Sequence, residues 1–258
     1  MKLLFLGTGT SVGVPVIGCD CPVCVSPDPR NRRLRSSLYV EAGGTALVVD
    51  TGPDFREQML RHHIRRLDAV CFTHSHADHV FGFDDIRRFN TIQDAIIPAY
   101  AVPGTMDDLL RIFDYVHRGD PVPGVYRPRI DFRVIREPFQ VGAIRVTACP
   151  VDHGPKPTVG YRFEAGGRRV GYFPDCLRMD AATVRQLQGL DIMILDALRH
   201  RPHSTHLTVA DSVALLQSIG ARQSYLVHLC HELDHAATQA GLPPGIDVSH
   251  DGLVCNLQ

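Results

Sequence analysis

The sequence of 258 residues has no tryptophan, only two lysines and no long apolar run. A membrane-spanning helix needs about 20 consecutive apolar residues, so the missing run argues against such a span. The formal net charge is −1, which argues against a general binder of nucleic acid or membrane surfaces. Hydrophobic residues make up 44% and charged residues 21%, and this ordinary usage excludes a disordered chain or a fibre.

The chain also lacks the pattern of a signal peptide. Its apolar start, Leu3–Leu6, is shorter than the roughly 7–15-residue core of such a peptide, and no small-residue cleavage site follows. We therefore expect a cytoplasmic protein. The eight cysteines are then interpreted as thiols or metal ligands, because disulfides are rare in that compartment.

Two residue types, arginine and histidine, are abundant instead. Arginine accounts for 25 of the 27 basic residues, since Lys2 and Lys156 are the only lysines, and there are 14 histidines. Arginine binds phosphate through two parallel hydrogen bonds, so a phosphate-rich substrate is one interpretation and codon bias is the simpler one. The histidines raise the question of whether they cluster.

The pattern of polar and apolar residues predicts short strands interspersed with helices. The expected strands are Lys2–Leu6, Ser37–Ala42, Thr45–Asp50, Asp68–Thr73, Ile97–Val102, Ile130–Arg136, Ile144–Cys149, Thr158–Glu164, Arg168–Phe173, Asp191–Leu195 and Ser224–Val227. The expected helices are Pro53–Ile64, Phe83–Phe89, Met106–Val116, Asp180–Leu187 and Thr208–Ile219. Hairpins in both halves favour two mostly antiparallel sheets with helices outside. No linker interrupts the pattern, so we expect one domain over residues 1–258, with an irregular cysteine-rich segment at 11–35.

One short segment concentrates metal-ligand residue types. His74, His76, Asp78 and His79 lie within six positions, directly after a predicted strand. Imidazole and carboxylate are ligands for zinc and for harder divalent ions. His74 and His76 are too close in sequence to share one helix face, but a loop at a strand end can turn both toward one ion. Asp78 and His79 then lie on the next turn, where they can face a second ion.

Further ligand-type residues follow other strands. His153, Asp175 and His228 each come shortly after an apolar strand. A single histidine in such a position is usually a turn or core residue. Three such residues in this order favour a second half of the same metal site.

These motifs together resemble the metallo-β-lactamase superfamily, and the resemblance extends through essentially the whole chain. HxHxDH is followed by a His, an Asp and a further His, and Asp50-Thr51-Gly52 resembles the first motif of that superfamily. The resemblance implies an α/β fold, a four-layer αββα sandwich with metals at one edge of the two sheets.

The resemblance also implies how the ligands are divided. One ion is held by His74, His76 and His153. The other ion is held by Asp78, His79 and His228. Asp175 bridges the two ions, and Asp50 orients one of the ligands from behind.

A second cluster consists of thiols. Cys19, Cys21 and Cys24 lie within six positions, and three thiols can close around one zinc ion if a fourth ligand completes the tetrahedron. The spacing leaves two candidates for that ligand, His231 and Cys230.

This cluster narrows the resemblance. Leu6–Thr10, then Gly13–Pro15, then CxCxxC resemble the PhnP-like subgroup, the phosphodiesterases that act on phosphoribosyl 1,2-cyclic phosphate. Members of that subgroup hold a structural zinc with three cysteines and one histidine. The matching residues are Cys19, Cys21, Cys24 and His231.

The same subgroup has a histidine that is not a metal ligand and contacts substrate phosphate just before a helix. The matching residue is His206, which precedes the predicted helix Thr208–Ile219. A protonated imidazole could bind phosphate or protonate the leaving alkoxide. His200 and His203 in the same loop are interpreted as surface residues.

We therefore expect an enzyme, a dinuclear metal-dependent hydrolase of small and cyclic phosphodiesters such as phosphoribosyl 1,2-cyclic phosphate or a cyclic nucleotide. A hydroxide bridging two ions about 3.5–4 Å apart would attack phosphorus in line. Asp175 would hold the ions together and His206 would assist the leaving group. The expected cofactors are two divalent ions, zinc or manganese, and one structural zinc. The expected partners are the phosphodiester and, in a homodimer, a second copy; neither membrane nor nucleic acid is expected.

Three other functions use similar residues. One is a thioester or lactone hydrolase similar to glyoxalase II, and another is a tRNA 3′-processing nuclease. The net charge of −1 and the lack of a glycine-rich basic arm argue against the nuclease. The third is a metal-binding protein without turnover, which the complete ligand set and the candidate acid His206 disfavour.

Overall fold

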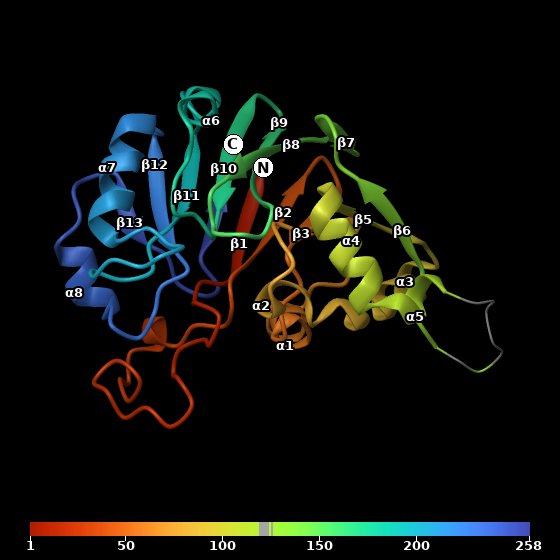
Figure 1. Cartoon of the computed structure of the whole chain (residues 1–258), viewed down its shortest axis with the longest axis horizontal. Coiled ribbons are helices and arrows are strands. Elements are labelled where there is room, and N and C mark those ends of the chain that lie inside the picture. Colours follow the sequence, from red (N-terminus) through yellow and green to blue (C-terminus); the bar gives the residue numbers. More distant parts are fainter. Residues whose placement is uncertain (119–123, 125) are drawn as a thin grey trace.

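Two sheets packed face to face form the centre of the molecule, with helices on both outer faces (Figure 1). The computed structural model describes residues 1–118, 124 and 126–258. The arrangement confirms the expected four-layer αββα sandwich. Among the described helices, none has the length and apolar character needed to cross a bilayer.

Each sheet has seven strands among the described residues. The first sheet has the order β14-β1-β2-β3-β4-β5-β6. Its strands are β1 (Lys2–Gly7), β2 (Ser37–Ala42), β3 (Thr45–Val49), β4 (Ala69–Cys71), β5 (Ile97–Ala101), β6 (Ile130–Val134) and β14 (Val254–Asn256). The second sheet has the order β13-β12-β11-β10-β9-β8-β7. Its strands are β7 (Phe139–Val141), β8 (Ile144–Val151), β9 (Thr158–Ala165), β10 (Arg168–Phe173), β11 (Ile192–Asp196), β12 (Gln223–Val227) and β13 (Ile246–Val248).

Helices cover the outer face of each sheet (Figure 1). The first sheet carries α1 (Phe55–Arg61), α2 (Ala77–Val80), α3 (Arg87–Gln93), α4 (Pro103–Ile112), α5 (Asp114–His117) and the 3₁₀ helix η2 (Phe83–Ile86). The second sheet carries α6 (Ala181–Gln186), α7 (Val209–Ile219) and α8 (His235–Ala240). The cysteine-rich segment, which ends near the 3₁₀ helix η1 (Pro29–Asn31), extends away from both sheets at the lower left of the view.

The expectation of mostly antiparallel sheets is wrong. In each sheet three neighbouring pairs are antiparallel and three are parallel. The glycine hairpins are correctly read as antiparallel, but helices connect the remaining strands as crossovers, and a crossover makes its two strands parallel. This difference matters for the site, because parallel strands end at the same edge of a sheet.

Strand alternation builds separate apolar layers. Leu3 and Phe5 of β1 lie between the two sheets, whereas Leu4 and Leu6 lie between the first sheet and its helices. Each such side chain is almost fully buried and stabilises the fold by about 1.5–3 kcal/mol. A third apolar layer lies between the second sheet and helices α6, α7 and α8. The apolar run at the start of the chain is therefore a central strand that packs on both faces.

Several short elements escape sequence analysis. The strands β7, β13 and β14 have three residues each, too few for a recognisable alternation. The strand β14 pairs antiparallel with β1, so it depends on a partner from the far end of the chain. The helix expected at Met106–Val116 is instead α4, which begins at Pro103 and ends at Ile112, followed by the separate turn α5. Proline is favoured at the first position of a helix, where its missing N–H costs nothing.

Candidate metal centre

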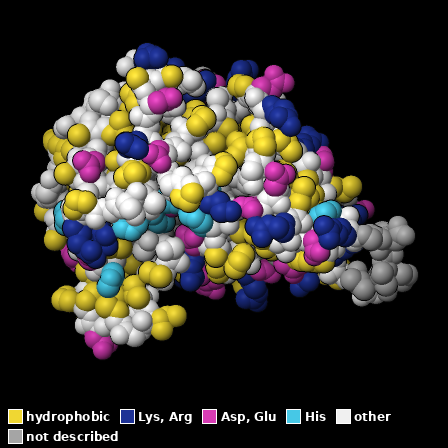
Figure 2. All heavy atoms as spheres, in the orientation of Figure 1, with side chains coloured by type: hydrophobic (Ala, Val, Ile, Leu, Met, Phe, Trp, Pro, Cys, Tyr) yellow, Lys and Arg dark blue, Asp and Glu magenta, His cyan; other side chains and the backbone are white. Residues whose placement is uncertain are grey.

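The predicted ligands meet where strands of both sheets end. Asp50 follows β3, His74 follows β4, and His153, Asp175 and His228 follow β8, β10 and β12. These strands run the same way within their sheets, so their carboxyl ends lie at one edge. Figure 2 shows histidine side chains gathered in a band near the middle of the visible face.

Two of these positions have unusual backbone angles. Asp50 has φ of 64° and His228 has φ of 61°, both in the left-handed region that favours glycine. A non-glycine residue held there costs on the order of 1–3 kcal/mol, and such residues cluster at functional sites. The fold accepts this cost at two positions where a strand must turn its side chain toward the site.

The HSHADH segment leaves β4 as a loop and then forms α2. His76 is the residue before the first turn, with extended backbone angles, and Asp78 and His79 lie within the helix. Nε2 of His74 and Nδ1 of His76 are 2.8 Å apart. The loop therefore brings the two imidazoles together, and the helical turn directs Asp78 and His79 to a neighbouring point.

The side chains form several overlapping groups, two of which match the expected division of ligands and are joined by one carboxylate. In each group the ligand atoms lie within 4.8 Å of one another. The first group is His74, His76 and His153, and the second is Asp78, His79 and His228. Oδ2 of Asp175 is 3.1 Å from Nε2 of His79, and Oδ1 is 3.5 Å from Nε2 of His153 and 3.4 Å from Nε2 of His228. Asp175 thus lies between the two groups, where a bridging ligand belongs.

Asp50 orients His79 from behind. Nδ1 of His79 donates to Oδ2 of Asp50 at 2.7 Å, and Asp50 is fully buried. The Thr73 hydroxyl donates to the same oxygen at 2.8 Å and lies 3.0 Å from Nδ1 of His74. Because both histidines direct Nδ1 at this network, each presents Nε2 to the centre.

His153 is oriented in the same way from the second sheet. Its Nδ1 lies 2.9 Å from the Thr205 carbonyl oxygen, which can only accept, so Nδ1 carries the proton. Nε2 is left without a proton and lies 3.4 Å from Nδ1 of His76. Three of the histidines therefore direct Nε2 inward because another group binds their Nδ1.

Buried polar atoms without hydrogen-bond partners indicate which kind of ligand the centre can bind. Among the described residues, Nε2 of His79, Oδ2 of Asp175 and both ring nitrogens of His228 are buried without a hydrogen-bond partner, because the 3.1 Å contact between the first two does not have hydrogen-bond geometry. Leaving such a group unpaired costs about 1–3 kcal/mol, so several at one point call for a common partner. Imidazole nitrogens and carboxylate oxygens suit zinc and manganese, and the residues present fit divalent cations.

The pKa shifts of the histidines also fit a site for divalent cations. Burial lowers the pKa of His74, His76 and His153, which favours the neutral imidazole that binds metals. Burial also acts on His79, but the carboxylates of Asp175 and the neighbouring acids outweigh it and raise its pKa. A cation bound at His79 would displace that proton, so metal affinity would fall as the pH falls.

His206 lies beside this centre. Its Nδ1 is 2.7 Å from Oδ2 of Asp196, and its Nε2 is 3.9 Å from Oδ1 of Asp175. The ring stacks on that of His228, with centroids 4.7 Å apart. In the described structure His206 thus faces the two ligand groups from the loop before α7.

Sequence reasoning does not single out Asp196 or Thr73. Asp196 ends the buried strand β11. A polar residue at the end of an apolar strand is the same signal that identifies Asp175 and His228. Thr73 carries no such signal, because only the fold shows that its hydroxyl joins Asp50 to His74. His200 is exposed, and His203 lies 3.3 Å from the amide nitrogen of Thr205.

The thiol cluster lies in the segment that extends from the body. Sγ of Cys19, Cys21 and Cys24 lie 3.2, 3.5 and 3.7 Å from Nδ1 of His231. The backbone amide of Cys24 lowers the pKa of Cys21 to about 6, which favours the thiolate that binds zinc. The Cys230 sulfur instead accepts a hydrogen bond from the Glu232 amide at 3.4 Å. Of the two candidates for the fourth ligand, the structure brings His231 to the thiols.

Comparison with known proteins gives a family context. A family model described as a beta-lactamase superfamily domain matches residues 45–229. A protein of Porphyromonas gingivalis named octanoyltransferase is 34% identical over 258 residues, covering 98% of this chain and 51% of that protein. The chain therefore spans about half the length of that relative.

Two solved structures share the fold. A crystal structure described as a new diphosphatase from the PhnP family has a TM-score of 0.91 and 39% identity, and covers 100% of this chain and 98% of that one. The Zn²⁺-bound PqqB of Methylobacterium extorquens has a TM-score of 0.81 and 24% identity, with both chains covered completely. The second likeness shows the fold alone.

Proposed function

Because the chain belongs to the beta-lactamase superfamily, we propose that it is a metal-dependent hydrolase of small phosphodiesters, including cyclic ones such as phosphoribosyl 1,2-cyclic phosphate. One observation carries this proposal. Asp175 lies between two groups of three ligand-type side chains, and buried atoms of Asp175, His79 and His228 lack hydrogen-bond partners. A paired ligand set of this kind suits the hydrolysis of a phosphate ester.

The residues that would hold the cations are those described above. His74, His76 and His153 would hold one divalent ion, Asp78, His79 and His228 the other, and Asp175 both. When bound, zinc or manganese ions supply Lewis acidity toward a phosphoryl oxygen and make water acidic enough to act as a nucleophile near neutral pH. Asp50, Thr73 and the Thr205 carbonyl would keep the ligand rings aimed inward.

His206 would protonate the leaving oxygen. Asp196 binds its Nδ1, so Nε2 is the nitrogen that faces the centre. Burial lowers the pKa of His206, although Asp175 and Asp78 oppose this effect. A lowered pKa makes the imidazolium a readier proton donor, and the contact with Asp196 would keep the ring oriented with Nε2 toward the leaving oxygen.

A comparison of substrates on metal-loaded protein tests the proposal. The substrates are bis(p-nitrophenyl) phosphate, a 2′,3′-cyclic nucleotide, ribosyl 1,2-cyclic phosphate and a glutathione thioester. We expect turnover of phosphodiesters and its loss in Asp78→Ala and His79→Ala proteins that stay folded by circular dichroism. Cleavage of the thioester with no cleavage of any phosphodiester would overturn the proposal in favour of a glyoxalase II-like activity.

A related activity is favoured by one observation. The 39% identical neighbour is described as a diphosphatase, so the bond cleaved could be a phosphoanhydride rather than a phosphoester. The same ligand set would serve both bonds, because each reaction transfers a phosphoryl group to water. Adding a nucleoside diphosphate sugar to the assay separates them: faster turnover of that compound than of the cyclic esters would favour diphosphate hydrolysis.

A further inference from the structure

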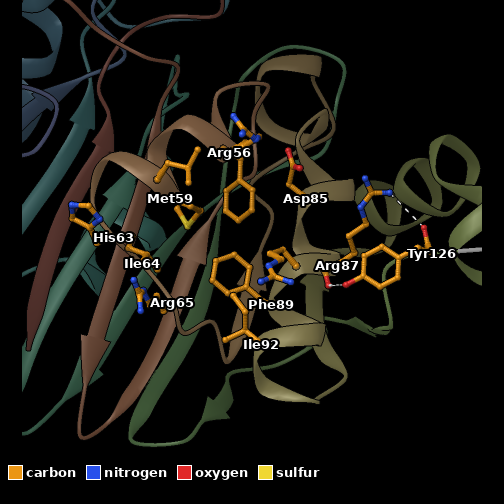
Figure 3. A pocket seen from close by; sticks show the side chains of 13 residues that line it. Arg56, Met59, His63, Ile64, Arg65, Asp85, Arg87, Phe89, Ile92 and Tyr126 are labelled. Carbon is orange, nitrogen blue, oxygen red and sulfur yellow. Dashed lines mark hydrogen bonds between the residues drawn. The ribbon is translucent and has the colours of Figure 1, made fainter.

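A second concave site lies away from the metal centre. It is a groove of about 520 Å³ between α1 with its following turn and the η2–α3 segment. Figure 3 shows the side chains that line it. None of them belongs to the candidate metal ligands, so the groove is lined by a separate set of residues.

The floor of the groove is apolar. The rings of Phe55 and Phe89 pack with centroids 6.1 Å apart, and both residues are almost fully buried. Met59 and Ile64 extend this floor along α1 and the turn after it (Figure 3). Ile92 closes the other side and keeps 48% of its surface exposed, so apolar area is available to a ligand.

The rim of the groove is basic. Arg56, Arg65 and Arg88 line it, and all three are exposed. Within the described part of the chain they form no ion pair and no side-chain hydrogen bond. The fourth arginine, Arg87, is already engaged, since it pairs with Asp84 at 3.0 Å and lies over the Tyr126 ring.

We propose that this groove binds a small amphipathic anion, a free organic acid with one carboxylate and an apolar chain. The lining has these three guanidinium groups and a single carboxylate, Asp85, which interacts electrostatically with Arg56, so the groove has an excess of positive charge. Arginine is suited to a carboxylate because its planar fork matches the two oxygens. The apolar floor suits the chain of such an acid, and the volume is that of a small-molecule site.

The positions of the arginines determine how much their charge adds to the affinity for the acid. In Figure 3, Arg56 and Arg65 lie on different sides of the apolar floor, so a carboxylate at either end of a bound chain meets a guanidinium. The arginines are exposed, and exposed ion pairs are weak. One exposed pair of this kind gives at most about a fivefold preference for the acid over a neutral analogue.

Isothermal titration calorimetry tests the proposal with decanoate and with decanol, both below the concentration at which they aggregate. We expect decanoate to bind with one site per chain and about three- to fivefold more tightly than decanol. The triple variant Arg56→Gln/Arg65→Gln/Arg88→Gln should lose this preference while its affinity for decanol is kept, because none of the three rim guanidinium groups remains. Ile92→Glu should weaken the binding of both, because it places a charge on the apolar wall.

Arg136→Gln provides the control, since it removes an exposed arginine outside the groove. It should bind both compounds as the unchanged protein does. The proposal is overturned if decanoate shows no saturable binding, if decanol binds equally well, or if Arg136→Gln reduces decanoate binding as much as the triple variant. Circular dichroism confirms that each variant is folded, so a loss of binding cannot be ascribed to unfolding.

Discussion

Oδ2 of Asp196 lies 2.7 Å from Nδ1 of His206, and this contact determines which ring nitrogen faces the metal centre. Asp196 is fully buried, and the Cys176 amide donates to the same oxygen at 3.0 Å. The Cys176 amide therefore holds the Asp196 side chain in place independently of its contact with His206. His206 in turn has its Nε2 3.9 Å from Oδ1 of Asp175.

This relationship predicts that the effect of His206 depends on the leaving group. With a 2′,3′-cyclic nucleotide the leaving alkoxide is strongly basic, so His206→Gln should lower kcat by about 10²–10⁴-fold. With bis(p-nitrophenyl) phosphate the leaving group needs no proton, and the loss should stay below about tenfold. Steady-state kinetics on both substrates measure the difference.

Asp196→Asn should show the same dependence on leaving group, to a smaller degree, with unchanged metal content. His200→Gln is the control, because His200 lies in the same loop and is exposed. Equal losses on the two substrates would show that His206 binds phosphate rather than donating the proton.

A second prediction concerns the hydrogen bonds behind the ligands. Asp50→Asn weakens the contact to His79, and Thr73→Val removes the hydroxyl near His74. Loss of such outer contacts typically weakens metal binding about 10–100-fold, and we expect this range for zinc measured by competition with a chelator. Ser75→Ala removes a hydroxyl of the same loop that binds Asp108 and should change zinc affinity much less. Unchanged zinc affinity in Thr73→Val would contradict the role given to this network.

A third prediction concerns the thiol cluster. Cys19→Ser and Cys24→Ser should each reduce the metal content from about three ions per chain to about two, because a structural zinc needs four ligands. The thermal midpoint should fall as well, since binding at such a site contributes to folding. Elemental analysis by mass spectrometry measures the ions. Cys230→Ser is the matched control, and a loss of zinc in that variant would assign the fourth ligand to Cys230.

A fourth prediction follows from a buried carboxyl outside both metal sites. Burial raises the pKa of Asp251 to about 6, although it accepts from the Leu34 amide and the Thr8 hydroxyl. The pKa in the unfolded chain is about 3.9. Between these values the folded protein binds more protons than the unfolded chain, so this group lowers the free energy of unfolding as the pH rises.

The size of that contribution is about 2 kcal/mol between pH 4 and pH 6. The Asp251→Asn protein has no carboxyl group to titrate at this position. Its free energy of unfolding should therefore fall less, or rise more, than that of the unchanged protein between pH 4 and pH 6. Urea unfolding at several pH values measures both proteins, and the comparison uses slopes because the substitution also alters hydrogen bonds. Parallel curves for the two proteins would show that Asp251 has the same pKa in the folded and unfolded states.

The local parts of the site are predictable from the sequence. His74, His76, Asp78 and His79 lie so close together that one loop and one helical turn place them all. The three cysteines of the extended segment are likewise gathered by their spacing. The fold class is predictable as well, but through resemblance, because the pattern alone indicated mostly antiparallel sheets.

The remaining contacts join residues that are distant in sequence. Asp50 and His79 are 29 positions apart, and Cys19 and His231 are 212 apart. The periodicity of apolar residues along the chain does not show which strands will end at the same edge of a sheet. For Asp196, the sequence shows a polar residue at a strand end but not that His206 will bind to it.

The sequence by itself determined which chemistry is available, because residue type and local spacing select metal ligands and thiols. Only the tertiary structure decided which of them meet. The physical reason is that parallel strands from both sheets bring Asp50, His153, Asp175 and His228 to one edge. The same packing decided which ring nitrogen His79, His153 and His206 present, since the partners at their Nδ1 atoms come from other strands and loops.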